Sequence, residues 1–110
     1  VACKGGHNGE PHNHNDVGSF LYYIGDEEII SDLGAGEYTK KYFGPERYEI
    51  LCNSSRGHSV PVIEGKYQCA GREYGAESFR GVNPWTVEIS YKKAYAIERY
   101  ILFRKQVRYR

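Results

Sequence analysis

The stretch SFLYYIGDEEIISD, residues 19–32, decides the expected fold. Two runs that favour β-structure, 19–24 and 27–32, flank the dipeptide Gly25-Asp26. A Gly-Asp pair between two such runs is typical of a tight hairpin turn, because glycine adopts a positive φ at little steric cost. The stretch therefore predicts an antiparallel β-hairpin.

Strand-like runs recur toward the end of the chain. We expect a strand over residues 58–64, with Pro61 at a sheet edge or strand start because proline cannot donate a ladder hydrogen bond. Another is expected over 85–91, where alternate residues share one face: Trp85, Val87, Ile89 and Tyr91. Over 96–109 a helix competes, but the β-branched and aromatic content favours a strand.

The remaining segments read as loops. Residues 1–16 are rich in Gly, His and Asn and predict an extended loop. Residues 37–57 mix aromatics with polar residues, which indicates a long ordered loop of the kind that carries function. Together these features predict an all-β fold, an antiparallel β-sandwich or sheet of about six or seven strands. Because alternation continues to Arg110, we expect residues 1–110 to be part of a larger β-domain.

Composition argues against several classes of function. Fifteen Lys and Arg against fourteen Asp and Glu give a net charge of +1, so there is no electrostatic case for nucleic acid or a membrane surface. No apolar run approaches the ~18–20 residues of a membrane span. The odd number and wide spacing of Cys3, Cys52 and Cys69 favour reduced thiols, and hence slightly a cytoplasmic location, with periplasmic or secreted locations open.

Histidine and aspartate cluster at His12-Asn-His14-Asn-Asp16. In an extended chain these three side chains share a face about 6–7 Å apart. Imidazole and carboxylate suit Zn²⁺, but at roughly 2.0–2.2 Å a strand cannot bring all three to one ion. One or two would bind, joined by side chains from elsewhere, for which Asp32 and His58 are candidates. The alternatives are a solvated His-rich loop, and turn-forming roles for the two aspartates.

Other catalytic patterns are missing from the sequence. No Gly-x-Ser-x-Gly elbow surrounds Ser19 or Ser59, and Cys52 lacks a cysteine-protease signature. Gly34-Ala-Gly36 is not followed by a helix pattern, so it is no dinucleotide loop. These absences leave the histidines as the leading chemical candidates.

Three motifs in order resemble the C-terminal β-domain of the heparinase II/III-like polysaccharide lyases. They are His12-Asn-His-Asn-Asp-Val-Gly-Ser-Phe20, then Asp32-Leu-Gly34 with Tyr38, and then Arg56-Gly-His-Ser-Val60 with Gly65-Lys-Tyr-Gln68. The resemblance covers residues 12–68 and becomes loose over 85–104. Two features depart from it: Ser59 stands where the family commonly has Asn, and residues 1–110 hold no counterpart of the helical toroid domain that precedes the β-domain in such lyases, which we expect to lie outside them.

The resemblance implies roles for individual residues. His14, Asp32 and His58 correspond to metal ligands, most often for zinc, and His12 to a catalytic histidine that reaches the substrate cleft. Asp16 is expected to steady an imidazole. A further group falls in the segment that borders the cleft and is expected to bind substrate: Arg47, Tyr48 and Arg56.

The implied reaction is β-elimination on a uronate-containing polysaccharide, such as a glycosaminoglycan or alginate. The missing helical domain of the same chain would supply a catalytic Tyr, so the isolated fragment is expected to be inactive. A non-catalytic carbohydrate-binding β-sandwich and a metal-stabilised structural module are the rival interpretations. Aromatic residues in a flat exposed row would favour binding, and aromatic residues around His12 would favour the lyase cleft.

Overall fold

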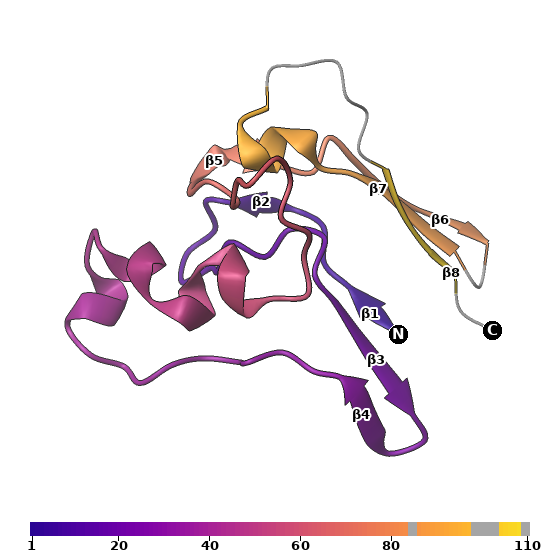
Figure 1. The fold of residues 1–110 in the computed structure, drawn as a ribbon, viewed down its shortest axis with the longest axis horizontal. Helices are drawn as coiled ribbons and strands as arrows, with labels where there is room; N and C mark the ends of the chain where they lie inside the picture. Colours follow the sequence, from indigo (N-terminus) through magenta and orange to yellow (C-terminus); the bar gives the residue numbers. More distant parts are fainter. Residues whose placement is uncertain (84–85, 98–103, 109–110) are drawn as a thin grey trace.

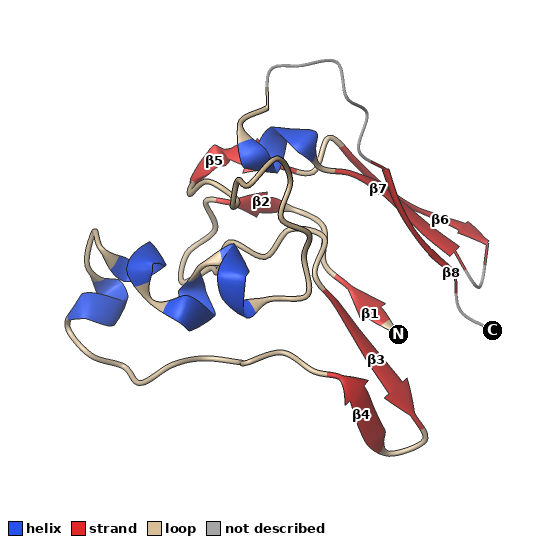
Figure 2. Cartoon of the chain, viewed as in Figure 1, coloured by secondary structure: helices blue, strands red, loops and turns tan. Residues whose placement is uncertain are grey.

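The computed structural model describes residues 1–83, 86–97 and 104–108 (Figure 1). Within these ranges the regular structure consists of short antiparallel strands and 3-10 helices of three or four residues (Figure 2). The predicted all-β, antiparallel fold class is therefore confirmed. In the described part of the chain, no helix has the length and apolar character needed to cross a membrane.

The first sheet contains the predicted hairpin. Strand β3 (Phe20–Ile24) pairs with β4 (Glu27–Ile30), and β1 (Ala2–Cys3) pairs with the other edge of β3. Gly25 in the turn has φ 58°, the left-handed conformation that a tight hairpin requires of one of its turn residues. The hairpin prediction is confirmed.

The second sheet corrects the expected loop over residues 1–16. Strand β2 (His7–Asn8) pairs with β5 (Gly71–Gly75). The Asn8 side chain is fully buried, and its amide donates to Gln68 Oε1 at 3.1 Å and to the Cys69 carbonyl at 2.9 Å. A buried polar anchor fixes this segment, and the hydrophobic periodicity used for the prediction does not detect such an anchor.

The third sheet has the order β6-β7-β8 and confirms part of the C-terminal prediction. Its strands are β6 (Ser78–Asn83), β7 (Thr86–Ser90) and β8 (Arg104–Arg108). The expected strand over 85–91 corresponds to β7, although Trp85 lies outside the described residues. Of the expected strand over 96–109, β8 confirms residues 104–108, whereas Ala96 ends the 3-10 helix η5 (Lys92–Tyr95) with φ 51°. Residues 98–103 and 109 lie outside the described residues.

The long segment after β4 runs back across the molecule to a group of short helices (Figure 1). It was expected to be a loop, and its irregular course instead contains a series of 3-10 turns. These are η1 (Lys41–Phe43), η2 (Arg47–Glu49), η3 (Leu51–Asn53) and η4 (Ser55–Gly57).

The expected strand over 58–64 is not formed. The Val60 amide bonds to the His58 carbonyl at 2.8 Å, and Pro61 has no amide hydrogen to donate. The recorded backbone hydrogen bonds of this segment run between near neighbours in the sequence. Its one bridge of the β type joins Ile63 to Lys66 across a tight turn. His58 is therefore held by the end of η4 and not by a strand.

One hydrophobic cluster joins the site loop to the C-terminal half. It packs Val17, which follows the His12–Asp16 segment, against residues of β7, η5 and their surroundings. Its members are Val17, Ile63, Ile89, Tyr91, Ala94, Tyr95 and Ile97. The base of the candidate site is thereby fixed to the core.

Candidate functional site

His12 occupies a left-handed turn, which overturns the expectation of an extended chain. Its φ is 57°, and the Asn13 amide bonds back to the Glu10 carbonyl at 3.2 Å. The three side chains expected on one face therefore diverge. His12 meets Phe43, His14 meets Tyr42 and His58, and Asp16 meets Lys4.

His14 and His58 come together from segments 44 positions apart in the sequence. Their ring centroids are 5.2 Å apart at an interplanar angle of 35°. Asp32 joins them, because its Oδ2 lies 2.5 Å from Nδ1 of His58 while its Oδ1 accepts a bond from the Gly34 amide at 2.8 Å. The structure thus gathers the three residues that the resemblance marked as ligands.

Tyr42 contacts Nε2 of His14. Its hydroxyl lies 3.0 Å from His14 Nε2, and its ring is 3% exposed. Burial raises the pKa of the Tyr42 phenol, so the hydroxyl is neutral near pH 7 and can donate to the imidazole. Burial, followed by repulsion from a charged His58, lowers the pKa of His14, which favours the neutral imidazole that a metal ion requires.

The donor atoms fit a metal ion in part. The His58 side chain is 1% exposed, and its Nε2 is buried with no hydrogen-bond partner in the structure as described. A histidine whose Nδ1 bonds a carboxylate and whose Nε2 is free has the arrangement of a metal-binding imidazole. Because Asp32 engages the opposite nitrogen, however, the described residues contain no set of three His, Cys, Asp or Glu side chains arranged to hold an ion.

His12 lies among aromatic rings at the surface. Its ring meets Phe43 edge-on with centroids 5.7 Å apart. Phe43 in turn contacts Tyr38 at 5.3 Å and Tyr42 at 5.1 Å. Phe43 is 50% exposed and Tyr38 71% exposed, so the two rings and the exposed His12 form one open aromatic surface.

The residue between the two histidines is held by η2. The Asn13 carbonyl accepts a bond from Arg47 Nη2 at 2.7 Å, and the Tyr48 hydroxyl donates to Asn13 Oδ1 at 2.7 Å. The guanidinium carbon of Arg47 lies 5.8 Å from the Tyr42 ring centroid and 5.2 Å from that of Tyr48. Two of the residues expected to bind substrate thus contact the histidine loop directly.

The two remaining predicted residues have other neighbours. Asp16 forms an ion pair with Lys4 at 2.5 Å, so the carboxylate bonded to an imidazole is Asp32 and not Asp16. Arg56 is exposed, and its guanidinium lies 5.8 Å from the ring centroid of Tyr67. Neither residue has a recorded bond to His12 or His14.

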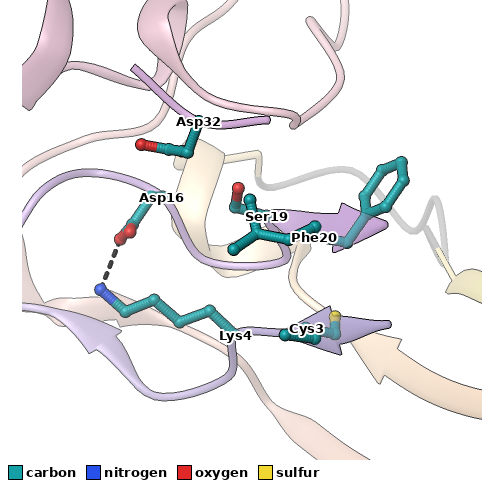
Figure 3. A pocket seen from close by; sticks show the side chains of 8 residues that line it. Cys3, Lys4, Asp16, Ser19, Phe20 and Asp32 are labelled. Carbon is teal, nitrogen blue, oxygen red and sulfur yellow. Dashed lines mark hydrogen bonds and ion pairs between the residues drawn. The ribbon is translucent and has the colours of Figure 1, made fainter. Parts of the chain in front are cut away.

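A cavity of about 330 Å³ lies beside this cluster, between β1, the start of β3 and Asp32 (Figure 3). The Lys4–Asp16 ion pair crosses one wall, and Ser19 and Phe20 form part of another. Since Asp32 contacts both His58 and this cavity, the hollow adjoins the histidine cluster.

Sequence reasoning missed the polar side chains that hold the site. Tyr42 contacts His14, and Asn13 anchors the loop between His12 and His14 through Tyr48. The Gln68 side chain accepts from the Val17 amide at 3.0 Å and donates to the Val17 carbonyl at 2.7 Å. The Gln68 side chain also accepts a bond from Asn8, and the Gln68 backbone amide donates to the Ser55 hydroxyl. Gln68 stood within a recognised motif, but nothing in its chemistry indicated such a role.

Comparison with known proteins gives one family. The model described as Heparinase II/III-like, C-terminal, matches residues 1–100. No curated protein matches the chain significantly.

Proposed function

Since the chain belongs to the heparinase II/III-like family through its C-terminal domain, we propose that it is the part of a polysaccharide lyase that brings a catalytic histidine to a uronate-containing chain. Membership of this family makes the full-length protein a lyase. The substrate class, the role of His12 and the metal site are our proposals.

β-Elimination at a uronic acid makes three chemical demands. A base removes the weakly acidic C5 proton, the electron pair forms the C4–C5 double bond, and the C4–O bond breaks as the leaving oxygen takes up a proton. The neighbouring carboxylate has to be neutralised or hydrogen-bonded first. A histidine can meet one of these demands near neutral pH, as base or as donor to the carboxylate.

The surroundings of His12 carry the proposal. Of His12 and His14 it is the exposed one, it stands in a turn, and its ring meets Phe43, which in turn contacts Tyr38. Exposed aromatic rings stack on the apolar faces of sugar rings, so a pyranose bound there would lie within reach of the imidazole. We assign His12 to catalysis and these two rings to substrate contact, with Arg56 a more distant candidate.

We propose that His14 and His58 bind a divalent metal ion, with zinc as the first candidate, and that Asp32 belongs to the same site through its bond to His58. The buried and unpartnered Nε2 of His58 and the adjacent imidazole of His14 support this. When bound, such an ion would stabilise the loop that carries His12 by cross-linking distant segments. Asp32 orients His58 through Nδ1, while Asp16 steadies the same loop through Lys4.

The rest of the active site is proposed to belong to a preceding helical domain of the full-length protein. In family terms residues 1–110 form part of the C-terminal β-sandwich, and a Tyr from the helical domain would complete the proton transfers. The described fragment contributes His12 alone to these transfers, so we expect residues 1–110 by themselves to be inactive.

The test is turnover by the full-length protein. Heparan sulfate, chondroitin sulfate and alginate are incubated with the enzyme, and the unsaturated uronate product is followed by its ultraviolet absorbance. We expect one polymer to be cleaved and His12→Ala to lose at least about a hundredfold in kcat, the scale of general acid–base catalysis. Unchanged turnover in His12→Ala would remove His12 from the mechanism.

A carbohydrate-binding module without catalysis is the second candidate. The exposed rings of Tyr38 and Phe43 favour it as well. Polysaccharide binding by the full-length protein with no unsaturated product from any of the three polymers would support this alternative. The direct contact of Phe43 with His12, and of Tyr38 with Phe43, favours the lyase.

A further inference from the structure

We propose that Arg47 and Tyr48 are positioning residues that fix His12 by holding Asn13. This inference rests on the proposed function, because it assigns the two residues to the geometry of the catalytic loop and not to substrate contact. The three residues Asn13, Arg47 and Tyr48 are called the Asn13 clamp below.

The clamp holds both oxygen acceptors of a single residue. Arg47 Nη2 donates to the Asn13 carbonyl and the Tyr48 hydroxyl donates to Asn13 Oδ1, each at 2.7 Å. Asn13 itself is 7% exposed, so water competes little for these bonds. The residue that links His12 to His14 is therefore fixed at its backbone and at its side chain.

The η2–η3 segment also holds Asn15, the residue that follows His14. The Asn53 side chain donates to the Arg47 carbonyl at 3.1 Å, and the Asn53 carbonyl accepts a bond from the Asn15 amide at 2.9 Å. Asn53 is fully buried in η3. Residues 13 and 15 are thus both bonded to the η2–η3 segment, and the loop cannot shift without breaking several bonds together.

His12 needs such support because its own conformation is unfavourable. A left-handed φ of 57° is uncommon for a residue with a Cβ, and such conformations persist where the surroundings impose them. Within its turn the recorded backbone bond is the 3.2 Å contact from the Asn13 amide to Glu10. Loss of the clamp would let the turn relax toward extended backbone and move the imidazole.

The environment of Arg47 also argues against direct capture of a substrate carboxylate. Its Nε is buried without a partner in the described structure, one Nη is bonded to Asn13, and two tyrosine rings flank the guanidinium. The side chain is directed into the protein. Its guanidinium donates to the loop carbonyl.

Tyr48→Phe tests the proposal, because it removes one hydroxyl and leaves the ring beneath Arg47. In the full-length protein we expect kcat to fall roughly 10- to 100-fold, the scale associated with small misplacement of a catalytic group, while KM changes less than about twofold. Tyr23→Phe is the matched control, since it removes an exposed hydroxyl that donates to Glu28 at 3.0 Å on the β3–β4 hairpin. We expect the control to leave both constants unchanged.

Hydrogen exchange provides a readout that is independent of turnover. In Tyr48→Phe the peptide that contains the Asn13 and Asn15 amides should exchange about tenfold faster, the effect of one lost hydrogen bond, and the melting temperature should fall by no more than a few degrees. In Tyr23→Phe exchange of this peptide should stay as in the wild type.

The outcomes separate the two proposals. If the wild-type protein cleaves none of the three polymers, the proposed function fails, and the exchange result still decides whether the clamp holds the loop. If the wild type is active and Tyr48→Phe keeps its kcat, the positioning role is overturned. A rise in KM with unchanged kcat would also overturn it, because it would indicate substrate contact.

Discussion

The imidazole of His58 is almost completely buried, and its two nitrogens differ in their surroundings. Nδ1 lies 2.5 Å from Asp32 Oδ2, whereas Nε2 has no hydrogen-bond partner among the described residues. A buried polar atom without a partner is costly, and the cost is removed when a ligand binds to it. The second imidazole, His14, is the nearest ring, at 5.2 Å.

Asp32→Asn should weaken metal binding while leaving the fold intact. The amide keeps the size of the carboxylate and can still accept from the Gly34 amide, but it no longer carries the charge that orients His58 and makes it more basic. We expect the zinc affinity of the full-length protein to fall about 10- to 100-fold, as measured by competition with a chelator and by elemental analysis.

Asp26→Asn is the matched control for this change. Asp26 lies in the exposed turn between β3 and β4. The control therefore makes the same carboxylate-to-amide change outside the histidine cluster. Zinc binding should be the same in this control and in the wild type. Equal affinity in Asp32→Asn and Asp26→Asn would contradict a role for the Asp32 carboxylate at the metal.

At the scale of single residues the sequence singled out His14, Asp32 and His58, because their chemistry and motif order are distinctive. The structure brings the three side chains together, and their role at a metal ion stays a prediction. Tyr42 was not found as a partner of His14, since an aromatic residue in a loop is compatible with many roles. Contacts of this kind depend on folding over long sequence separations.

Among the elements, the pairing of β2 with β5 brings two backbones unusually close. A Cβ placed on Gly9, just after β2, would lie against the backbone of Arg72 in β5. Backbone atoms cannot move aside as a flexible side chain can, so only glycine fits there. This pairing fixes the start of the loop that carries His12.

Gly9→Ala should therefore destabilise the protein by about 1–3 kcal/mol, the usual cost of overpacking. Urea unfolding of the full-length protein measures the effect, provided that the transition of this domain is resolved. Gly81→Ala on β6 is the control, because nothing lies within 4 Å of its added Cβ and its φ is not positive. A loss of stability no greater in Gly9→Ala than in Gly81→Ala would show that the close approach is not maintained.

Elements formed by local interactions were predicted well, and those set by distant partners were not. The β3–β4 hairpin follows from its Gly25-Asp26 turn, which acts over a few residues. The strand expected over 58–64 was wrong because its apolar character serves the core through Ile63, while its backbone bonds within itself around Pro61. β2 was missed because it is held by the buried side-chain amide of Asn8 and shows no apolar periodicity.

For the molecule as a whole, two tyrosines link the C-terminal half to the site. Tyr95 is 1% exposed, donates its hydroxyl proton to the Pro61 carbonyl at 2.6 Å, and accepts from Gln68 at 3.3 Å. Tyr91 is 3% exposed and packs against Tyr95 with ring centroids 6.0 Å apart. Gln68 in turn holds Val17, so the core and the site loop share one network.

This packing predicts a loss of stability in alkaline solution. Burial, followed by the neighbouring Tyr95, raises the pKa of Tyr91 from 10 to about 12. Between these values the unfolded chain releases the phenol proton while the folded chain keeps it. Stability from this group is therefore complete below pH 10 and is lost as the pH rises toward about 12, by at most about 3 kcal/mol.

Tyr91→Phe isolates the contribution of this phenol, since it keeps the buried ring and removes the proton. Burial also raises the pKa of Tyr95 and Tyr42, so the variant should still lose stability between pH 10 and 12, but with a shallower slope than the wild type. Chemical unfolding at several pH values in this window measures both slopes. Equal slopes in Tyr91→Phe and the wild type would mean that Tyr91 is not buried in the folded protein, and the core cluster that fixes Val17 beneath the histidine loop would then need revision.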